Sequence, residues 1–89
     1  MKLTIKLFPP YRKKGDSGEH SLELDQGSVT VEQLSQYLFR DWKDKFDYPI
    51  IDERHHLTAE FMVNGKHVST GHSLEDGDQV SVIPYLCGG

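Results

Sequence analysis

The chain has 89 residues, of which 36% are hydrophobic and 27% are charged, and its formal net charge at pH 7 is -4. This length allows one small compact core and no deep catalytic cleft. Non-specific nucleic-acid binding needs a net basic surface, and a membrane span needs about 20 apolar residues, so we expect neither nucleic-acid nor membrane partners. Cys87 is the one cysteine, which excludes an internal disulfide and favours a cytoplasmic location.

Two strands are predicted to open the chain. Residues 2–8 alternate between apolar and polar side chains, the period of a half-buried strand. Pro9-Pro10 ends this strand, because proline cannot donate a hydrogen bond to a neighbouring strand. After a polar loop over residues 11–18, a second strand is predicted with Leu22 and Leu24 facing inward.

One helix is predicted to follow. Thr30 is a good N-cap, and Gln33 three residues later completes a capping-box pattern. Apolar residues at spacings of three and four predict a helix that continues through Lys43 and Lys45 and stops before Pro49. The stripe that we expect to face the core comprises Val31, Leu34, Leu38, Trp42 and Phe46.

The second half of the chain is predicted to hold three more strands. A long connection, residues 47–58, comes first, and its Ile50 and Ile51 are expected to fold back onto the core. Strands are then predicted at residues 59–63, 66–69 and 79–83, joined by an Asn64-Gly65 turn and by an acidic turn over residues 75–78.

This order of elements predicts an α+β fold. One main helix has the long apolar stripe, so it must cover one face of a mixed four- to five-stranded sheet. The helix crossover places the first and last strands as parallel central neighbours, which is the ubiquitin-like β-grasp arrangement. We expect residues 1–89 to form a single domain with a flexible C-terminal diglycine tail at about residues 84–89.

The second half of the sequence contains a series of short motifs: Val63-Asn64-Gly65, then Leu74-Glu75-Asp76-Gly77-Asp78-Gln79-Val80, then Pro84 and Gly88-Gly89. In this order they resemble the MoaD/ThiS family of ubiquitin-like sulfur carriers. In that family a V-N-G motif and an L-x-D-G-D-x-V motif lead into a free diglycine. The order and spacing of these short motifs are more specific than any one of them.

A C-terminal carboxylate with a pKa near ~3.5 is ionised and a poor electrophile, so a partner must activate it. The resemblance implies that Gly89 is adenylated by a ubiquitin-activating-type enzyme (MoeB/ThiF-like) that consumes ATP. A persulfide donor then makes a thiocarboxylate, which gives its sulfur to a MoaE- or ThiG-like synthase. Gly88 would let the tail pass through a narrow channel, since glycine lacks Cβ. The protein would be a co-substrate with no catalytic side chains and no bound cofactor.

Strand alternation predicts a docking face next to the tail. Lys6, Phe8, Met62, Ile83 and Tyr85 should lie on the outer face of the sheet, opposite the core. Some of these side chains are larger and more apolar than a solvated face requires, which favours a partner patch over scattered surface hydrophobes. The predicted docking residues are Met62, Ile83, Tyr85 and Leu86.

The remaining reactive residues give weaker signals. Cys87 departs from the small or hydroxyl residues that commonly precede the diglycine in the family; it is either a possible accessory thiol or a small side chain without a role. The five histidines lack the spacing of a zinc site, so no metal is expected.

Several functions remain open from the sequence. Pro84 before the tail and the longer middle loop favour a molybdopterin-type carrier for molybdenum cofactor biosynthesis, over a carrier for thiamine thiazole or another sulfur metabolite. The same tail would serve a protein modifier conjugated through Gly89. A plain β-grasp interaction module is the third class, and it would not need Gly88-Gly89.

Overall fold

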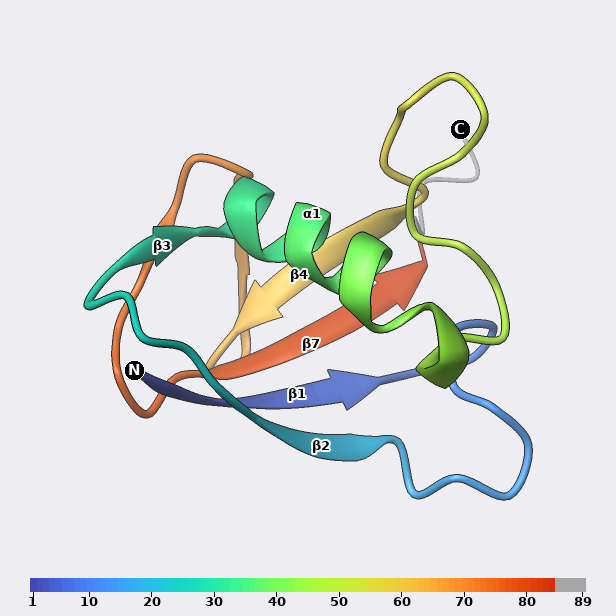
Figure 1. Ribbon diagram of the computed structural model, residues 1–89, viewed down its shortest axis with the longest axis horizontal. Helices are drawn as coiled ribbons and strands as arrows, with labels where there is room; N and C mark the ends of the chain where they lie inside the picture. The colour runs from blue at the N-terminus through green and yellow to red at the C-terminus, as the bar shows by residue number, and fades with distance from the viewer. Residues whose placement is uncertain (85–89) are drawn as a thin grey trace.

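The computed structural model describes residues 1–84 and shows one helix crossing one face of a five-stranded sheet (Figure 1). The strand order is β2-β1-β7-β4-β5. The strands are β1 (Lys2–Leu7), β2 (Glu19–Glu23), β4 (Ala59–Val63), β5 (Lys66–Val68) and β7 (Gln79–Pro84). β1 and β7 run parallel, and the other neighbours pair antiparallel. The predicted mixed β-grasp sheet is confirmed.

Alternating residues of the central strands build the core. Ile5 pairs with Val80 and Leu7 pairs with Val82 across the parallel β1–β7 ladder, and all four side chains are buried. Phe61 of β4 pairs with Val82 from the other side and is also buried. Because each strand alternates, the residues between these positions point to the opposite, open face of the sheet.

The helix α1 (Val31–Asp41) begins as the sequence predicts. The Thr30 hydroxyl accepts from the Gln33 backbone N–H at 3.2 Å, and the Gln33 side chain accepts from the Thr30 N–H at 2.9 Å. This capping box satisfies two backbone donors that have no partner inside the helix. Leu34 and Leu38 lie on the buried face of α1 and pack on the sheet.

The helix ends earlier than predicted. It stops at Asp41, and a short 3-10 helix, η1 (Lys43–Lys45), follows in place of a last α-helical turn. Phe46 then forms a β-bridge with Arg12, and the Asp47 N–H donates to the Tyr11 carbonyl at 2.9 Å. These tertiary contacts pull the chain into an extended path. Trp42 and Phe46 still contribute to the core and its flank, as the stripe predicted.

A second, two-stranded sheet was not predicted. β3 (Val29–Thr30) pairs antiparallel with β6 (Ser73–Leu74) at the start of α1. The neighbouring loop supplies backbone carbonyls to the first turn of the helix: Val31 N–H donates to His72 and Glu32 N–H donates to Thr70, both at 2.9 Å. Each of these strands has only two residues, too few for an alternation of apolar and polar side chains to be recognised in the sequence.

The connection after η1 closes the core, as expected. Ile50 and Ile51 are buried, and Ile51 forms a β-bridge with Leu57. The predicted turn after β4 is also present, because Asn64 and Gly65 have φ of 52° and 86°, the left-handed pair of a tight hairpin turn.

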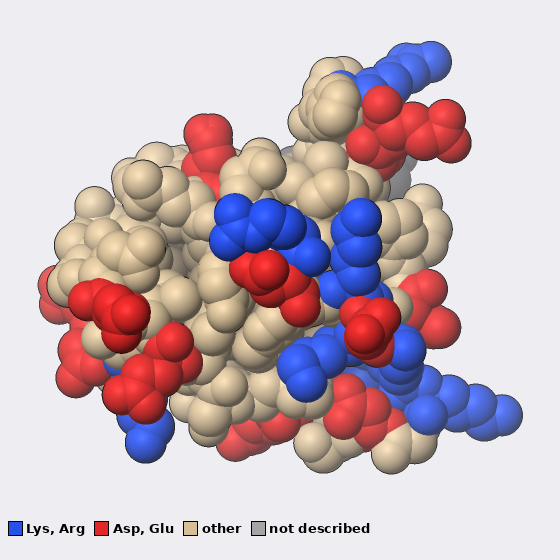
Figure 2. Space-filling model, viewed as in Figure 1, with Lys and Arg blue, Asp and Glu red and all other residues tan. Residues whose placement is uncertain are grey.

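Charge on the helix side of the molecule is mixed. Figure 2 shows Lys and Arg side chains interleaved with Asp and Glu side chains over the C-terminal part of α1 and the segment that follows. Among residues 1–84, no helix has the length and apolar character that a membrane crossing requires.

Candidate partner surface at the end of the central strand

The central strand β7 lies between β1 and β4 and directly precedes the predicted diglycine tail in the sequence. Its last residue, Pro84, pairs with Ala59 of β4, so the sheet includes the residue at which the tail was predicted to begin. The tail was predicted at about residues 84–89, and its extent stays a prediction because residues 85–89 lie outside the described part. The predicted residues that lie outside the described part are Tyr85, Leu86, Cys87, Gly88 and Gly89.

Met62 and Ile83, the two described members of the predicted docking set, lie on the open face of the sheet. In the β4–β7 register Met62 opposes Ser81, and Ile83 lies two residues further along β7. The two apolar side chains are thus diagonal neighbours on one face, within reach of a single partner surface. Both are partly exposed, whereas Val82 between Ser81 and Ile83 is fully buried on the helix side.

Phe8 extends this pair across to β1. Its N–H donates to the Val82 carbonyl at 3.2 Å, which continues the parallel ladder by one residue and sets Phe8 beside Ile83. The side chain is 44% exposed, one of two large hydrophobics that the described residues leave this open. We call Phe8, Met62 and Ile83 the apolar patch. Phe8 was predicted on this face but was not among the predicted docking residues.

Two polar side chains border the apolar patch and were missed from the sequence. Glu60 opposes Ile83 on β4, and His67 opposes Met62 on β5. The Glu60 carboxylate lies 3.9 Å from His67 Nδ1, so the two form an ion pair when the imidazole is protonated. Only the β4–β5 register brings them together, and the turn at Asn64-Gly65 fixes that register.

A charged loop stands at the same end of the sheet, where β7 ends and β4 begins (Figure 1). Asp52 organises it, because its carboxylate accepts backbone N–H bonds from Arg54 and His56, each at 2.9 Å. The bond from His56 is the main cause that lowers the pKa of Asp52 below its ordinary value of 3.8, with a smaller contribution from Arg54. The loop thus presents its charges in a defined conformation next to the end of β7.

These residues offer apolar contacts and fixed charges, which suit recognition of a protein partner. Within residues 1–84, no group of three or more His, Cys, Asp or Glu side chains could hold a metal ion.

A comparison with sequence families supplies the decisive observation: a profile of the ThiS family matches residues 5–89. The chain belongs to the ThiS family.

Solved structures agree with this assignment of the ThiS-family chain. A proposed molybdopterin converting factor subunit 1 from Pyrococcus furiosus is 30% identical, with a TM-score of 0.68 over 96% of this chain and 98% of that one. SAMP1 from Haloferax volcanii is 17% identical, with a TM-score of 0.70 over all of both chains. The complex of subunits 1 and 2 of molybdopterin-converting factor from Helicobacter pylori contains a chain 17% identical, with a TM-score of 0.56 over all of both chains. Curated protein sequences gave no significant match.

ThiS-family and MoaD-type proteins are small ubiquitin-like carriers and not catalysts. The predicted relationship to the MoaD/ThiS family is therefore confirmed. For a carrier, the useful features are a surface that other proteins recognise and a chain end that they can modify.

Proposed function

We propose that this ThiS-family protein carries sulfur as a thiocarboxylate on the carboxyl group of Gly89. The observation that supports the proposal most directly is the family match, which spans residues 5–89 and so includes the whole segment that follows β7. β7 is held by neighbours on both sides, so that segment leaves from a rigid part of the sheet. Because the end of β7 is held in the sheet, the chain end that follows it would reach an activating enzyme in fewer orientations.

The chemistry requires other proteins. An ionised carboxylate is a poor electrophile, so a MoeB/ThiF-like partner would first join Gly89 to AMP, consuming ATP and releasing pyrophosphate. A persulfide donor would attack this acyl-adenylate and displace AMP. A second thiol would then attack the donor sulfur of the resulting acyl disulfide, forming a disulfide with the donor and leaving the thiocarboxylate on Gly89. This chain supplies the carboxylate, and Gly88 and Gly89 let the backbone enter a narrow active site.

The sulfur acceptor is proposed to be of the molybdopterin type. Support comes from the 30% identity over almost the full length of both chains with the Pyrococcus furiosus protein. The sulfur would then pass to a MoaE-like synthase. A ThiG-like synthase, which would make thiamine thiazole, is the alternative acceptor.

We propose that the apolar patch docks the activating enzyme. Phe8 and Ile83 lie side by side at the end of β1 and β7, and Met62 is the diagonal neighbour of Ile83. Tyr85 and Leu86 would extend the contact along the tail. An enzyme that encloses Gly88 and Gly89 must also lie close to this end of the sheet, so docking and chemistry involve one partner face.

Intact-protein mass spectrometry tests the proposal. The chain is incubated with ATP, a persulfide donor, a thiol reductant and a MoeB/ThiF-like enzyme, and its mass is then measured. The expected result is the mass change for one carboxylate oxygen replaced by sulfur, absent when Gly88 and Gly89 are deleted. Adducts to lysines of other proteins would instead show that the chain acts as a protein modifier. An unchanged mass, with binding kept by the deletion variant, would favour a plain interaction module.

Cys87 has its own control in the same experiment. A thiol two residues before Gly89 is close enough along the chain to attack the activated carboxyl group. Replacing Cys87 with serine keeps the size of the side chain and removes the thiol. Unchanged thiocarboxylate yield would show that Cys87 is dispensable, and a reduced yield would make it an accessory group.

A further inference from the structure

The edge of the sheet formed by β2 has backbone groups that point away from the molecule. Met1 and Leu24 exchange both backbone hydrogen bonds, at 2.7 and 2.8 Å, and the Leu7 N–H donates to Gly18 at 2.6 Å. In an antiparallel pair such bonded positions alternate, so residues 20, 22 and 24 bond to β1. The N–H and C=O groups of Glu19, Ser21 and Glu23 therefore face outward.

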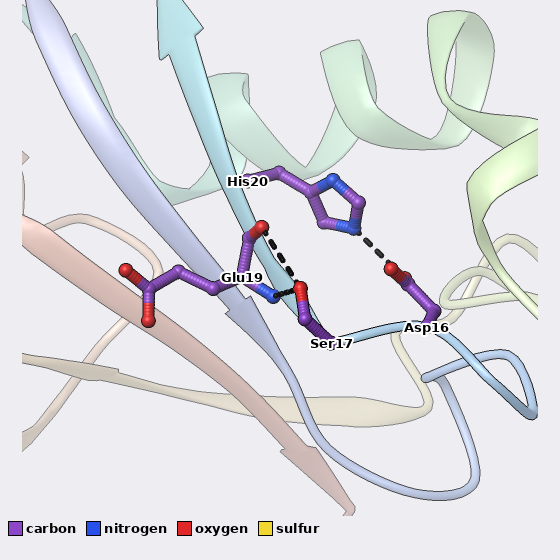
Figure 3. Close-up of polar contacts among 4 residues, drawn as sticks. All are labelled: Asp16, Ser17, Glu19 and His20. Atoms are coloured by element: carbon purple, nitrogen blue, oxygen red, sulfur yellow. Dashed lines mark hydrogen bonds and ion pairs between the residues drawn. The ribbon is translucent and has the colours of Figure 1, made fainter.

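One end of this edge is already covered. The Ser17 hydroxyl accepts from the Glu19 N–H at 3.3 Å and donates to the Glu19 carbonyl at 3.5 Å (Figure 3). No such contact is present at Ser21 or Glu23 within residues 1–84. Four backbone groups, two at each residue, are thus available to an added strand. The other edge strand, β5, has only three residues.

A groove on the helix side begins at Leu24, the residue after β2. Its volume is about 350 Å³, and it lies between the segment that follows β2 and the exposed side of α1. Leu24 and Gln26 line one wall, and Gln33, Tyr37 and Arg40 line the other. The Arg40 guanidinium lies 5.8 Å from the Tyr37 ring centroid, so an aromatic-cation pair borders the groove. An added strand would direct alternate side chains into this space.

The charges along β2 select the occupant. Glu19 and Glu23 are exposed on the open-face side of the strand, and Ser21 lies between them. Two copies of this chain that paired antiparallel about Ser21 would set Glu19 opposite Glu23, and a parallel in-register pair would also align like charges. Like charges directly opposite each other are destabilising. A second copy is therefore disfavoured. Lys6 and Lys2 of β1 lie opposite Glu19 and Glu23, so Lys or Arg on an added strand would continue the alternation of opposite charges across the sheet.

We propose that β2 is a binding edge for an extended, basic segment of a partner protein. The segment adds a sixth strand by bonding to Ser21 and Glu23, places basic side chains beside Glu19 and Glu23, and directs apolar side chains toward the groove. Its basic residues are four apart, as the two glutamates are. Met62 and Ile83 of the apolar patch are separated from this edge by β1, so a partner on the edge and a partner on these two residues need not compete.

Peptide binding to the isotope-labelled full-length protein tests the proposal. The probes are a blocked hexapeptide that alternates lysine and valine, and one of equal length that alternates glutamate and valine. The lysine peptide is expected to shift the NMR amide signals of Ser21 and Glu23 and to slow their hydrogen exchange. Stronger shifts at Thr4 or Met62 on the open face, or equal binding of both peptides, would overturn the proposal.

Two variants address the backbone and the charges separately. Ser21→Pro removes an outward N–H, which an edge strand tolerates, and should weaken lysine-peptide binding about tenfold, whereas Ser21→Ala should bind normally. Glu19→Gln combined with Glu23→Gln removes both negative charges without opposing Lys6 and Lys2 with like charges, should abolish the preference for the lysine peptide, and keeps the test decisive if the proline variant does not fold. Unchanged affinity in a folded Ser21→Pro variant, or an unchanged preference in the double variant, contradicts the proposal. The test needs no ATP or activating enzyme, so its result is independent of the sulfur-carrier function.

Discussion

The Asn64 side-chain amide donates a hydrogen bond to the Asp78 carboxylate at 2.9 Å, which ties the β4–β5 turn to the turn before β7. The same side chain accepts from the Gln79 N–H at 2.9 Å. Asn64 also has a φ of 52°, a conformation that asparagine tolerates better than most residues. One residue thus holds the turn and aligns two neighbouring strands.

Replacing Asn64 with alanine should destabilise the protein. The variant loses two side-chain hydrogen bonds and forces alanine into the left-handed region, which together cost about 2–4 kcal/mol. The free energy of unfolding by urea measures the loss. Lys66→Ala in the same hairpin is the control and should change stability by less than about 0.5 kcal/mol. Equal effects of the two substitutions would show that the Asn64 contacts contribute little.

Gly15 and Gly18 form a matched pair in the β1–β2 loop, because their φ values are 88° and 83°. A Cβ at Gly15 would meet nothing within 4 Å, whereas at Gly18 it would lie 2.7 Å from the Leu7 carbonyl oxygen. Gly15→Ala should cost about 1–2 kcal/mol from backbone strain alone. Gly18→Ala should cost at least about 1 kcal/mol more, since backbone must move. Urea unfolding of both variants separates strain from steric overlap, and similar losses would contradict the close contact.

The strands could be predicted because the sheet has one buried face. Leu3, Ile5 and Leu7 alternate with polar residues, and this period survives in the structure as alternating burial. The helix end could not be predicted, because residues 46 and 47 are held by Arg12 and Tyr11 from a distant loop. Local periodicity carries no information about such a contact.

The residues of the candidate surface could likewise be predicted only in part from the sequence. Met62 and Ile83 follow from alternation along single strands, so the sequence could place them on the open face. The position of Phe8 beside Ile83 and of His67 near Glu60 depends on the registers between strands. Those registers are fixed by the whole fold and not by one segment.

The capping box of α1 allows a test of how much local hydrogen bonding at the helix start contributes to the stability of the protein. Thr30→Ala removes the hydroxyl that accepts from the Gln33 N–H and should cost about 0.5–2 kcal/mol. Gln36→Ala changes an exposed residue of the same helix outside the cap and should have little effect. Thermal unfolding followed by circular dichroism gives both values. A cap variant as stable as the Gln36 variant would show that the loop over residues 70–72 caps α1 sufficiently.

Asp16 and His20 make stability depend on acidity. His20 Nε2 donates to the Asp16 carboxylate at 2.9 Å, and this bond lowers the pKa of Asp16 below its ordinary value of 3.8 (Figure 3). A depressed pKa in the folded state means that the contribution is fully present above about pH 4 and is lost as pH falls through the folded value. Asp16→Asn should therefore flatten the loss of stability below pH 4. Asp44→Asn, on the exposed 3-10 helix, is the control; an identical acid dependence in both variants would contradict the link.

The apolar patch predicts variants that fold but are activated poorly. Ile83→Glu and Met62→Glu place a charge on a partly exposed position and should lower the kcat/KM of adenylation about tenfold or more, mainly by raising KM. Thr4→Glu, on the same face near the start of β7, should leave adenylation unchanged. Pyrophosphate release measures the rate, and circular dichroism checks the fold. Normal activation of both patch variants would remove this face from the docking surface.

The position of β7 also bears on how the protein is made. β7 follows the other described strands in the chain and so leaves the ribosome after them, yet it lies between β1 and β4, which are not paired with each other in the sheet. A nascent chain that lacks residues 79–84 has no strand to join the β1–β2 hairpin to the β4–β5 hairpin, and the long-range pairing of β1 with β7 forms slowly compared with local contacts. Folding must therefore wait for translation to pass residue 84. An enzyme that recognises Phe8 beside Ile83 would consequently select completed, folded molecules and ignore translation fragments.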